Sequence, residues 1–545
     1  MKHELSASHS AAVNRRRRVI VNYDTNFGSP SIFVPLAGKD MEKIVSDYFS
    51  MVDEPGVTMD SIWWCWLDGN YANYPSEVLP VWELPGLKSW WEAGIDPVRV
   101  FCEETRKRGK EAFFSYRLNG TDMTSIAPLS RPLYKDAHPD WLIHTWESYG
   151  NPGYWNFAKR GVREYKIQIL KEIAENYDYD GIEIDFARVP VTLPPGRQWE
   201  NRGHLTTFMR AVRKMTLEEE ENRGRPFLLA ARVPETLEGC HFDGIDVEAW
   251  AREQLVDLFI LGNRSFDVDI AAFRRISDGT GIKLYPCVDD HHATDGYLHP
   301  PIEVLRGVYS NWWHQGADGI QTFNFEHTLP ARDERVRLLH RQSYREMARP
   351  GNLRHKDKTF VLQRRGGGHG STVVPNPEEW TTPRWMYYIT NMLAPLPADL
   401  SDDGKADTLL MVYIADDLSP ASTAVAAVSI HVLLSDPSAA GQPLSGRLQP
   451  ANIVTSKVHT LETIPPASDI VQYLELRVNN ALLDSPSADG GWLVFPARPD
   501  QFAIGNNLIG IRVNRRDVKA HDPMSIEKLE VHVRYSSSQS QYNAT

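Results

Sequence analysis

Short runs of branched and aromatic residues alternate with longer amphipathic stretches between Val19 and about Arg345. This alternation is typical of a parallel sheet whose strands are joined by covering helices. Eight strands are predicted, at 19–23, 61–66, 112–118, 181–186, 227–233, 255–261, 282–288 and 319–325. Helices are predicted between them, among others at 97–108, 162–175, 205–221, 247–252 and 301–316. The pattern therefore predicts an α/β fold of the (β/α)8 TIM-barrel type.

The longest predicted loops follow strands rather than precede them, at 68–90, 119–156 and 289–300. In a (β/α)8 barrel the strand-to-helix loops build the active site, because they all lie at the carboxyl ends of the strands. The extra sequence therefore marks that end of the barrel as the expected substrate-binding face.

After Pro350 the alternation of strands and helices ends. Short strand-like runs separated by turn residues recur at 409–414, 425–434, 473–478, 492–495, 507–513 and 529–535. Regular short strands without helices predict an antiparallel β-sandwich domain, which could bind carbohydrate or cap the barrel. Four regions are expected: a basic flexible lead at 1–18, a catalytic barrel at 19–350, a linker and packing segment at 351–405 and the sandwich at 406–545.

Composition restricts the kinds of partner. Hydrophobic residues make up 42% of the chain and charged residues 24%, as in ordinary globular proteins. The 59 basic and 71 acidic residues give a net charge of -12, which disfavours a nucleic-acid partner because a polyanion is repelled. The four cysteines are far apart and form no CxxC pair, so buried free thiols are expected.

No apolar run approaches the roughly 20 residues of a membrane-spanning helix, so no membrane partner is expected. Arg15 to Arg18 are followed by three apolar residues and then by Asn22, which leaves no room for the apolar part of a secretion signal. The expected location is cytoplasmic, or secreted or periplasmic if a leader is missing from the sequence.

The most informative segment is the fourth predicted strand, Gly181 to Phe186. Because side chains alternate along a strand, Glu183 and Asp185 share the side of Gly181, whereas the apolar residues between them face the opposite way. If this strand carried only one acid, the simpler interpretation would be that the acid accepts hydrogen bonds from the amides of a neighbouring loop. Two carboxylates on the inner face of one barrel strand favour catalysis.

The same alternation brings polar residues of other strands to the inner face. It predicts inward-facing side chains at Asn22, Asp24, Ser115, Arg117, Asn119, Ala230, Arg232, Thr322, Asn324 and Glu326. Phe323 and Phe325 are expected to face the helices. Positions filled only for packing would carry Val, Ile and Leu, so the polar residues predict a binding cup.

Three arginines, Arg117, Arg188 and Arg232, are expected near neighbouring strand ends. They could neutralise Glu183 or Asp185 as structural ion pairs. Alternatively, their planar forks match carboxylate and sulfate oxygens and would form a pocket for an acidic or sulfated sugar. The sequence leaves both interpretations open.

Aromatic residues are frequent in and after the second strand, where Trp63 is a candidate platform for a sugar ring. Asp289, Asp290, His291 and His292 after the seventh strand suggest metal ligands, but adjacent residues of an extended chain diverge and no HxH or HxxxH partner is near. The segment is therefore expected to hydrogen-bond substrate, and neither a metal nor another cofactor is predicted.

Three motifs carry a resemblance to a known superfamily, at 114–119 (FSYRLN), 180–186 (DGIEIDF) and 317–325 (ADGIQTFNF). In these the chain resembles the (β/α)8 glycoside hydrolases, in particular the glycosyl-hydrolase-like proteins with a barrel followed by a β-sandwich. The second motif is similar to the DGxDxDxE motif of family 18 chitinases, but Ala187 replaces its last acid, which argues against a substrate-assisted mechanism. It is also similar to strand four of retaining α-glycosidases, which implies that Asp185 is the nucleophile.

A two-carboxylate mechanism needs a second acid that protonates the leaving oxygen. Glu326 after the eighth strand and Glu235 after the fifth are the leading candidates, followed by Asp289 and Asp290. Glu183 lies one layer deeper and would raise the pKa of a protonated neighbour by like-charge repulsion.

These patterns predict a glycoside hydrolase that acts on an oligo- or polysaccharide. Two alternatives remain: a noncatalytic carbohydrate-binding protein on a barrel scaffold, and a polysaccharide lyase or isomerase that uses the His291 loop as base. The oligomeric state is not predicted.

Overall fold

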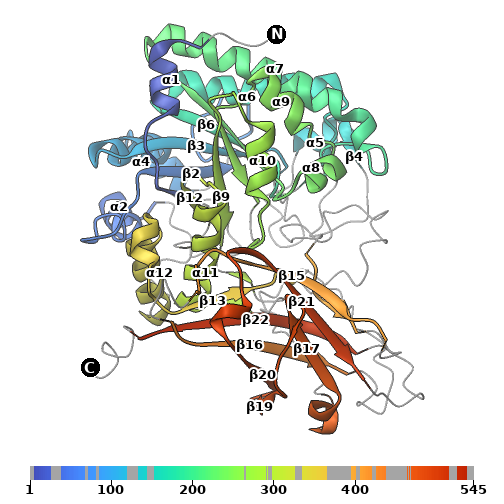
Figure 1. The fold of residues 1–545 in the computed structure, drawn as a ribbon. Coiled ribbons are helices and arrows are strands. Elements are labelled where there is room, and N and C mark those ends of the chain that lie inside the picture. Colours follow the sequence, from blue (N-terminus) through green and yellow to red (C-terminus); the bar gives the residue numbers. More distant parts are fainter. Residues whose placement is uncertain are drawn as a thin grey trace.

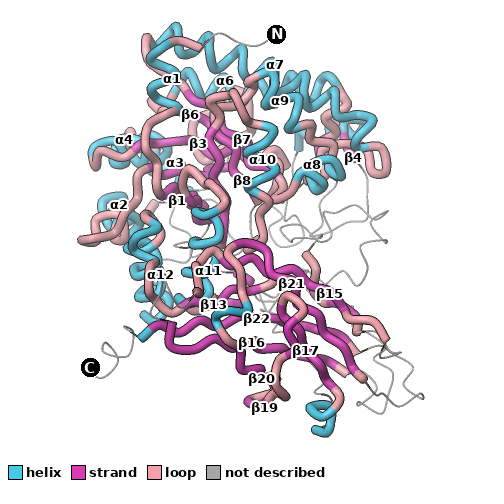
Figure 2. The backbone as a smooth tube through the Cα atoms, viewed as in Figure 1, coloured by secondary structure: helices cyan, strands magenta, loops and turns pink. Residues whose placement is uncertain are grey.

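The computed structural model contains a closed barrel of eight parallel strands, followed by two antiparallel sheets (Figure 1). It describes residues 5–25, 38–67, 71–81, 85–119, 133–143, 153–188, 190–262, 265–289, 291–292, 297–323, 325, 334–364, 394–400, 405–419, 425–436, 463, 466, 468–514 and 524–536. Helices surround the barrel, whereas the second domain consists mainly of strands (Figure 2). The predicted fold class is therefore confirmed.

Each predicted barrel strand is present. The barrel strands are β1 (Val19–Asp24), β2 (Ser61–Leu67), β3 (Glu111–Arg117), β6 (Gly181–Asp185), β7 (Leu228–Val233), β8 (Leu258–Leu261), β9 (Lys283–Val288) and β12 (Ile320–Phe323), in the spatial order β1-β12-β9-β8-β7-β6-β3-β2. The helices of this domain, apart from α1, are α2 (Met41–Phe49), α3 (Pro85–Glu92), α4 (Pro97–Lys107), α5 (Leu133–Ala137), α6 (Arg160–Asn176), α7 (Gln198–Arg223), α8 (Leu237–Asp243), α9 (Val247–Glu253), α10 (Ile270–Ile276), α11 (Ile302–His314) and α12 (Glu334–Glu346). Two short hairpins, β4 (Leu142–Ile143) with β5 (Tyr154–Trp155) and β10 (His291–His292) with β11 (Tyr297–Leu298), follow β3 and β9.

Aspartates that precede four strands connect them to their neighbours at the amino end of the barrel. Asp60, Asp180, Asp257 and Asp318 accept hydrogen bonds from the backbone N–H groups of Val19, Ala112, Leu229 and Leu284. Gly181 and Gly319 follow two of these aspartates, and an ideal Cβ at either glycine would lie 2.5 Å or less from a neighbouring backbone oxygen. The Asp-Gly pairs therefore allow the close strand contacts that set the register.

Residues 5–18 close the amino end of the barrel. α1 (Ala7–Val13) contributes Ala12 and Val13 to the same buried cluster as the inward-facing barrel residues. Arg17 is 1% exposed and donates to both carboxylate oxygens of Glu111, at 2.5 and 2.7 Å. α1 and the buried Arg17 therefore differ from the expected flexible lead, although Arg15 and Arg16 of the basic run are exposed.

The second domain is a β-sandwich with a hydrophobic core of its own. One sheet contains β13 (Lys358–Val361), β22 (Ser525–Tyr535), β16 (Val425–Ser435), β20 (Trp492–Ala497) and β19 (Ser487–Asp489), with β14 (Ala398–Asp399) paired to β22. The other contains β15 (Thr408–Ile414), β21 (Gly505–Val513), β17 (Leu474–Val478) and β18 (Ala481–Leu482). β13 and β14 lie in the segment predicted as a linker, so the sandwich begins earlier in the chain than expected.

The sandwich contacts loops at the carboxyl end of the barrel. Tyr297 of β11 donates its hydroxyl hydrogen bond to Glu530 of β22 at 2.8 Å. After β8, the Phe266 N–H donates to the side-chain oxygen of Gln363 at 2.7 Å, and the Gln363 N–H donates to Asp267 at 3.1 Å. The sandwich therefore supports the loops that follow two barrel strands. Among the described residues, no helix is long and apolar enough to cross a membrane.

We expect Asp267→Asn to stabilise the protein at pH 8 but not at pH 4. Burial raises the pKa of Asp267 to about 6, although the hydrogen bond from the Gln363 N–H opposes the rise. The folded protein therefore holds this proton more tightly than the unfolded chain, and the ionised carboxyl lowers stability increasingly as the pH rises from about 4 to about 6. An asparagine oxygen still accepts the Gln363 hydrogen bond without a charge. Since the side chain is partly exposed, the gain at pH 8 should be about 1–2 kcal/mol in thermal unfolding.

The exposed neighbour Asp269 provides a matched control. It caps α10 by accepting from the Ala272 N–H at 2.9 Å, and asparagine can also cap a helix. Asp269→Asn should therefore show the same small effect at both pH values. An equal gain at pH 4 and pH 8 for Asp267→Asn would contradict the burial argument.

Candidate active site

The inner carboxylate of β6, Glu183, is enclosed by protein donors. It is fully buried and accepts hydrogen bonds from Asn22 at 2.9 Å, Ser115 at 2.5 Å and Arg232 at 3.0 Å. Burial raises the pKa of Glu183 and the charge of Asp185 adds to the rise, while Arg232 and Ser115 oppose it. These contacts support a positioning role for Glu183 in the lower layer of the cup.

Asp185 is the last residue of β6 and differs from Glu183 in its surroundings. Its Oδ1 atom accepts from the backbone N–H groups of Ala187 at 3.0 Å and Arg188 at 2.9 Å. Its Oδ2 atom receives no hydrogen bond from the described residues, and Nη1 of Arg232 lies 3.8 Å from it. The carboxylate, which is only 1% exposed, is thus held in place through one of its two oxygens.

Arg232 connects the two acids. It is fully buried, and its Nη2 donates to Oε1 of Gln321 on β12 at 2.9 Å. Burial lowers the pKa of Arg232, but the negative charges of Glu183 and Asp185 raise it by more than burial lowers it. The guanidinium therefore stays charged. This places a fixed positive charge 3.8 Å from Oδ2 of Asp185.

Arg117 forms a second buried pair with Asp24 of β1. Arg232 therefore pairs with Glu183, as one of the two interpretations from the sequence expects, whereas Arg117 pairs with Asp24 and not with Glu183 or Asp185. Arg188 is also buried and contributes its backbone N–H to Asp185.

The predicted orientation of the eighth strand is wrong for Thr322 and Phe323 but confirmed for Phe325, whose ring packs against His340 and Tyr344 of α12. The Thr322 hydroxyl lies 2.9 Å from the hydroxyl of Tyr344 on α12, so Thr322 faces the helices. Phe323 belongs to the inner cluster, and its ring centroid lies 4.5 Å from the Arg232 guanidinium. Asn324 and Glu326 lie outside the described residues, so their inward orientation stays a prediction.

Two other candidates serve packing and loop attachment. Trp63 is fully buried inside the barrel, where its ring stacks on Phe113 at 4.5 Å between centroids. Its expected role as a sugar platform is not supported, because this position fills the inner core. Asn119 donates to the Val191 carbonyl at 2.6 Å and accepts from the Trp155 N–H at 2.9 Å, which ties together two loops.

The other acidic candidates lie beyond the ends of β7 and β9. Glu235 is 5% exposed, and its Cβ lies 3.1 Å from where a Cβ would stand at Gly262, after β8. Asp289 directly follows β9 and is fully buried. Asp290 lies outside the described residues, and His291 is described only as part of β10. Within the described ranges, no group of three or more His, Cys, Asp or Glu residues is placed to hold a metal ion.

The arrangement can perform acid-base or nucleophilic chemistry at one end of the barrel. Asp185 and Glu235 lie at or just beyond the carboxyl ends of adjacent strands, since Asp185 pairs in register with Arg232 of β7. Because Asp185 ends its strand, a ligand would reach it from the side of the strand-to-helix loops.

No family model matches the chain. Over 143 residues it is 32% identical to "Glycosyl hydrolase YngK" of Bacillus subtilis (strain 168), and the match covers 24% of this chain and 26% of that protein. The chain thus matches only about a quarter of the length of this curated relative. The match confirms, over that part, the resemblance to glycosyl hydrolases that the motifs predict.

Two solved structures are similar to the chain at low scores. One is the α-L-fucosidase isoenzyme 2 from Paenibacillus thiaminolyticus, with 15% identity and a TM-score of 0.41 over 64% of this chain and 51% of that chain. The other is the PgaB (BpsB) glycoside hydrolase domain from Bordetella bronchiseptica, with 11% identity and a TM-score of 0.41 over 61% of this chain and 99% of that chain. TM-scores this low establish no shared function.

Proposed function

We propose that the protein is a glycoside hydrolase that cleaves O-glycosidic bonds with Asp185 and Glu235 as its two carboxylates. The observation that carries the proposal is the state of Asp185, a buried carboxylate at a strand end with one oxygen held by backbone amides and the other without a hydrogen bond from the described residues. The similarity to a glycosyl hydrolase over part of the chain supports the same reaction class.

The two acids differ in their surroundings, and this difference suggests their roles. Two backbone N–H groups fix Asp185 at the end of β6 with Arg232 nearby, which suits a nucleophile or a group that stabilises positive charge at the anomeric carbon. Glu235 lies beyond the next strand and would donate the proton to the leaving oxygen.

The charges around the cup favour a neutral sugar. Among the described residues, the candidate acids Asp24, Glu183, Asp185, Glu235 and Asp289 outnumber the arginines Arg117, Arg188 and Arg232. Since two arginines already pair with these acids, an acidic or sulfated substrate, the other option from the sequence, would enter a site with an excess of carboxylates.

A substrate screen tests the proposal. Purified full-length protein is incubated with neutral, uronic and sulfated oligosaccharides, and the products are analysed. Release of a reducing sugar from neutral glycans is expected. Binding without any product would favour the noncatalytic alternative, and an unsaturated product would favour a lyase.

Replacing Glu235 with glutamine tests the assignment of the acid. We expect hydrolysis of natural glycosides to slow by about 10²–10⁴-fold, because the amide cannot protonate the leaving oxygen. Aryl glycosides with acidic phenol leaving groups need little protonation and should lose much less activity. Steady-state rates on both substrate types measure this difference, and an equal loss on both would argue against Glu235 as the acid.

A further inference from the structure

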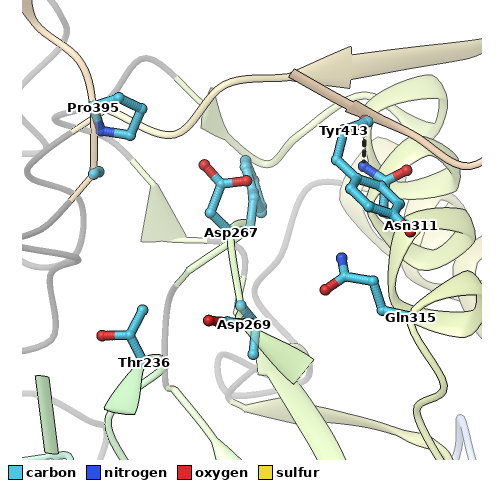
Figure 3. Close-up of a pocket in the computed structure, with 10 residues that line it drawn as sticks. Thr236, Asp267, Asp269, Asn311, Gln315, Pro395 and Tyr413 are labelled. Carbon is cyan, nitrogen blue, oxygen red and sulfur yellow. Dashed lines mark hydrogen bonds between the residues drawn. The ribbon is translucent and has the colours of Figure 1, made fainter. Parts of the chain in front are cut away.

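A second polar pocket lies where the barrel meets the sandwich (Figure 3). It has a volume of about 230 Å³ and is lined by residues that follow β7 and β8, by the end of α11, by the segment before β14 and by β15. It lies beside the proposed active site, since Thr236 on its wall directly follows Glu235. The pocket is nevertheless built from different side chains.

Two carboxylates in the pocket accept hydrogen bonds, and the side-chain amide of Gln315 can both donate and accept. Figure 3 shows Asp267, Asp269 and Gln315 arranged around the same space. One oxygen of Asp269 caps α10, and the Gln315 side chain makes no hydrogen bond with the described residues. No lysine or arginine is among those lining residues that the structure describes. Such a surface suits a ligand with several hydroxyl donors and no negative charge.

Tyr413 of β15 adds an aromatic wall that is held in place by α11. Its hydroxyl oxygen lies 2.7 Å from Nδ1 of His314, and its carbonyl accepts from the Asn311 side chain at 2.9 Å. Aromatic rings beside a few convergent polar groups are typical of small-molecule sites, and sugars offer both an apolar ring face and hydroxyl groups.

We propose that this pocket binds one neutral sugar ring and is a carbohydrate site separate from Asp185. Its volume lies below the roughly 300–1,000 Å³ of sites for drug-sized ligands, so a single ring is the largest unit that fits. Because residues of both domains line the pocket, the proposal gives the sandwich a part in carbohydrate binding. The proposal does not require hydrolysis at Asp185.

An introduced thiol gives a readout specific to this pocket. The four native cysteines are buried and free, so Gln315→Cys places an accessible thiol on the pocket wall. Its alkylation by iodoacetamide is followed by mass spectrometry in the presence of methyl glucoside, methyl galactoside, methyl mannoside, methyl glucuronide or calcium chloride. At least one neutral glycoside is expected to slow alkylation, while the glucuronide does not.

Gln472→Cys is the matched control, because Gln472 is an exposed glutamine of the sandwich at the end of a short helix. Its alkylation should not respond to any sugar. Protection by calcium or by the glucuronide without protection by a neutral glycoside would overturn the proposal, and so would no protection at all. Asp185→Asn in the same background should leave the protection unchanged, which separates this result from a failure of the proposed hydrolase function.

Discussion

Asp185→Asn is expected to lower glycan hydrolysis by roughly 10⁴-fold, the scale seen when a central catalytic group is removed. The asparagine oxygen can still accept the backbone hydrogen bonds from Ala187 and Arg188, so the loop after β6 should keep its conformation. What disappears is the negative charge beside Arg232, and with it the nucleophile or charge stabiliser. Initial rates on the substrate found by screening measure the loss, and circular dichroism checks the fold.

Asp180→Asn is the matched control on the same strand. Asp180 precedes β6 at the opposite end and pairs with Arg106 at 2.8 Å and Arg225 at 3.1 Å. The substitution removes the same charge far from the proposed reaction, so the rate should change little while stability falls slightly. If the folded Asp185→Asn protein hydrolysed the substrate at the rate of the Asp180→Asn protein, Asp185 would have no catalytic role.

Alternation along single strands made most of the cup predictable. Glu183, Asp185, Arg117 and Arg232 face inward as predicted, because the pleat fixes the direction of each side chain once the apolar face of the strand is known. Which partner each group meets depends on the register between strands. The sequence alone therefore left the arginines divided between ion pairs and an anion pocket.

The eighth strand shows how the same rule can fail. Phe323 and Phe325 suggest an apolar outer face, and Phe325 does pack against α12, yet Phe323 lies inside, next to Arg232. The signal that could have corrected this is the segment Asp318-Gly319, which repeats Asp180-Gly181 before β6. In both pairs the aspartate accepts a neighbouring N–H and the glycine faces inward, which places Gln321 in the cup.

Contacts between distant segments account for the other differences. Arg17 looks like part of a solvated basic run, and only the fold brings Glu111 against it. β13 is too short to stand out from a linker, and its pairing with β22, far along the chain, defines it as a strand. A local sequence pattern cannot reveal such pairs, because neither partner differs from what its own segment of the sequence would contain without the contact.

Arg232→Met is expected to lower the free energy of unfolding by about 3–5 kcal/mol, the usual cost of leaving a buried charge without its partner. The methionine keeps much of the volume beside Phe323 but leaves Glu183 and Asp185 without the nearby cation. Burial raises the pKa of Glu183 and Arg232 opposes this rise, so without Arg232 the protonated form of Glu183 is favoured further. The destabilisation should therefore be larger at pH 8 than at pH 5. Chemical denaturation at the two pH values measures it.

Two further variants separate charge from packing. Arg210→Met breaks an exposed pair with Glu253 and should cost less than about 1 kcal/mol. Glu183→Gln combined with Arg232→Met removes a buried acid together with its cation, and should recover much of the stability lost in the single variant. If the double variant is stable but inactive, the buried pair of Arg232 and Glu183 contributes to the reaction as well as to the fold. If the Arg232→Met protein were as stable as the Arg210→Met protein, the buried cluster would not depend on the charge of Arg232.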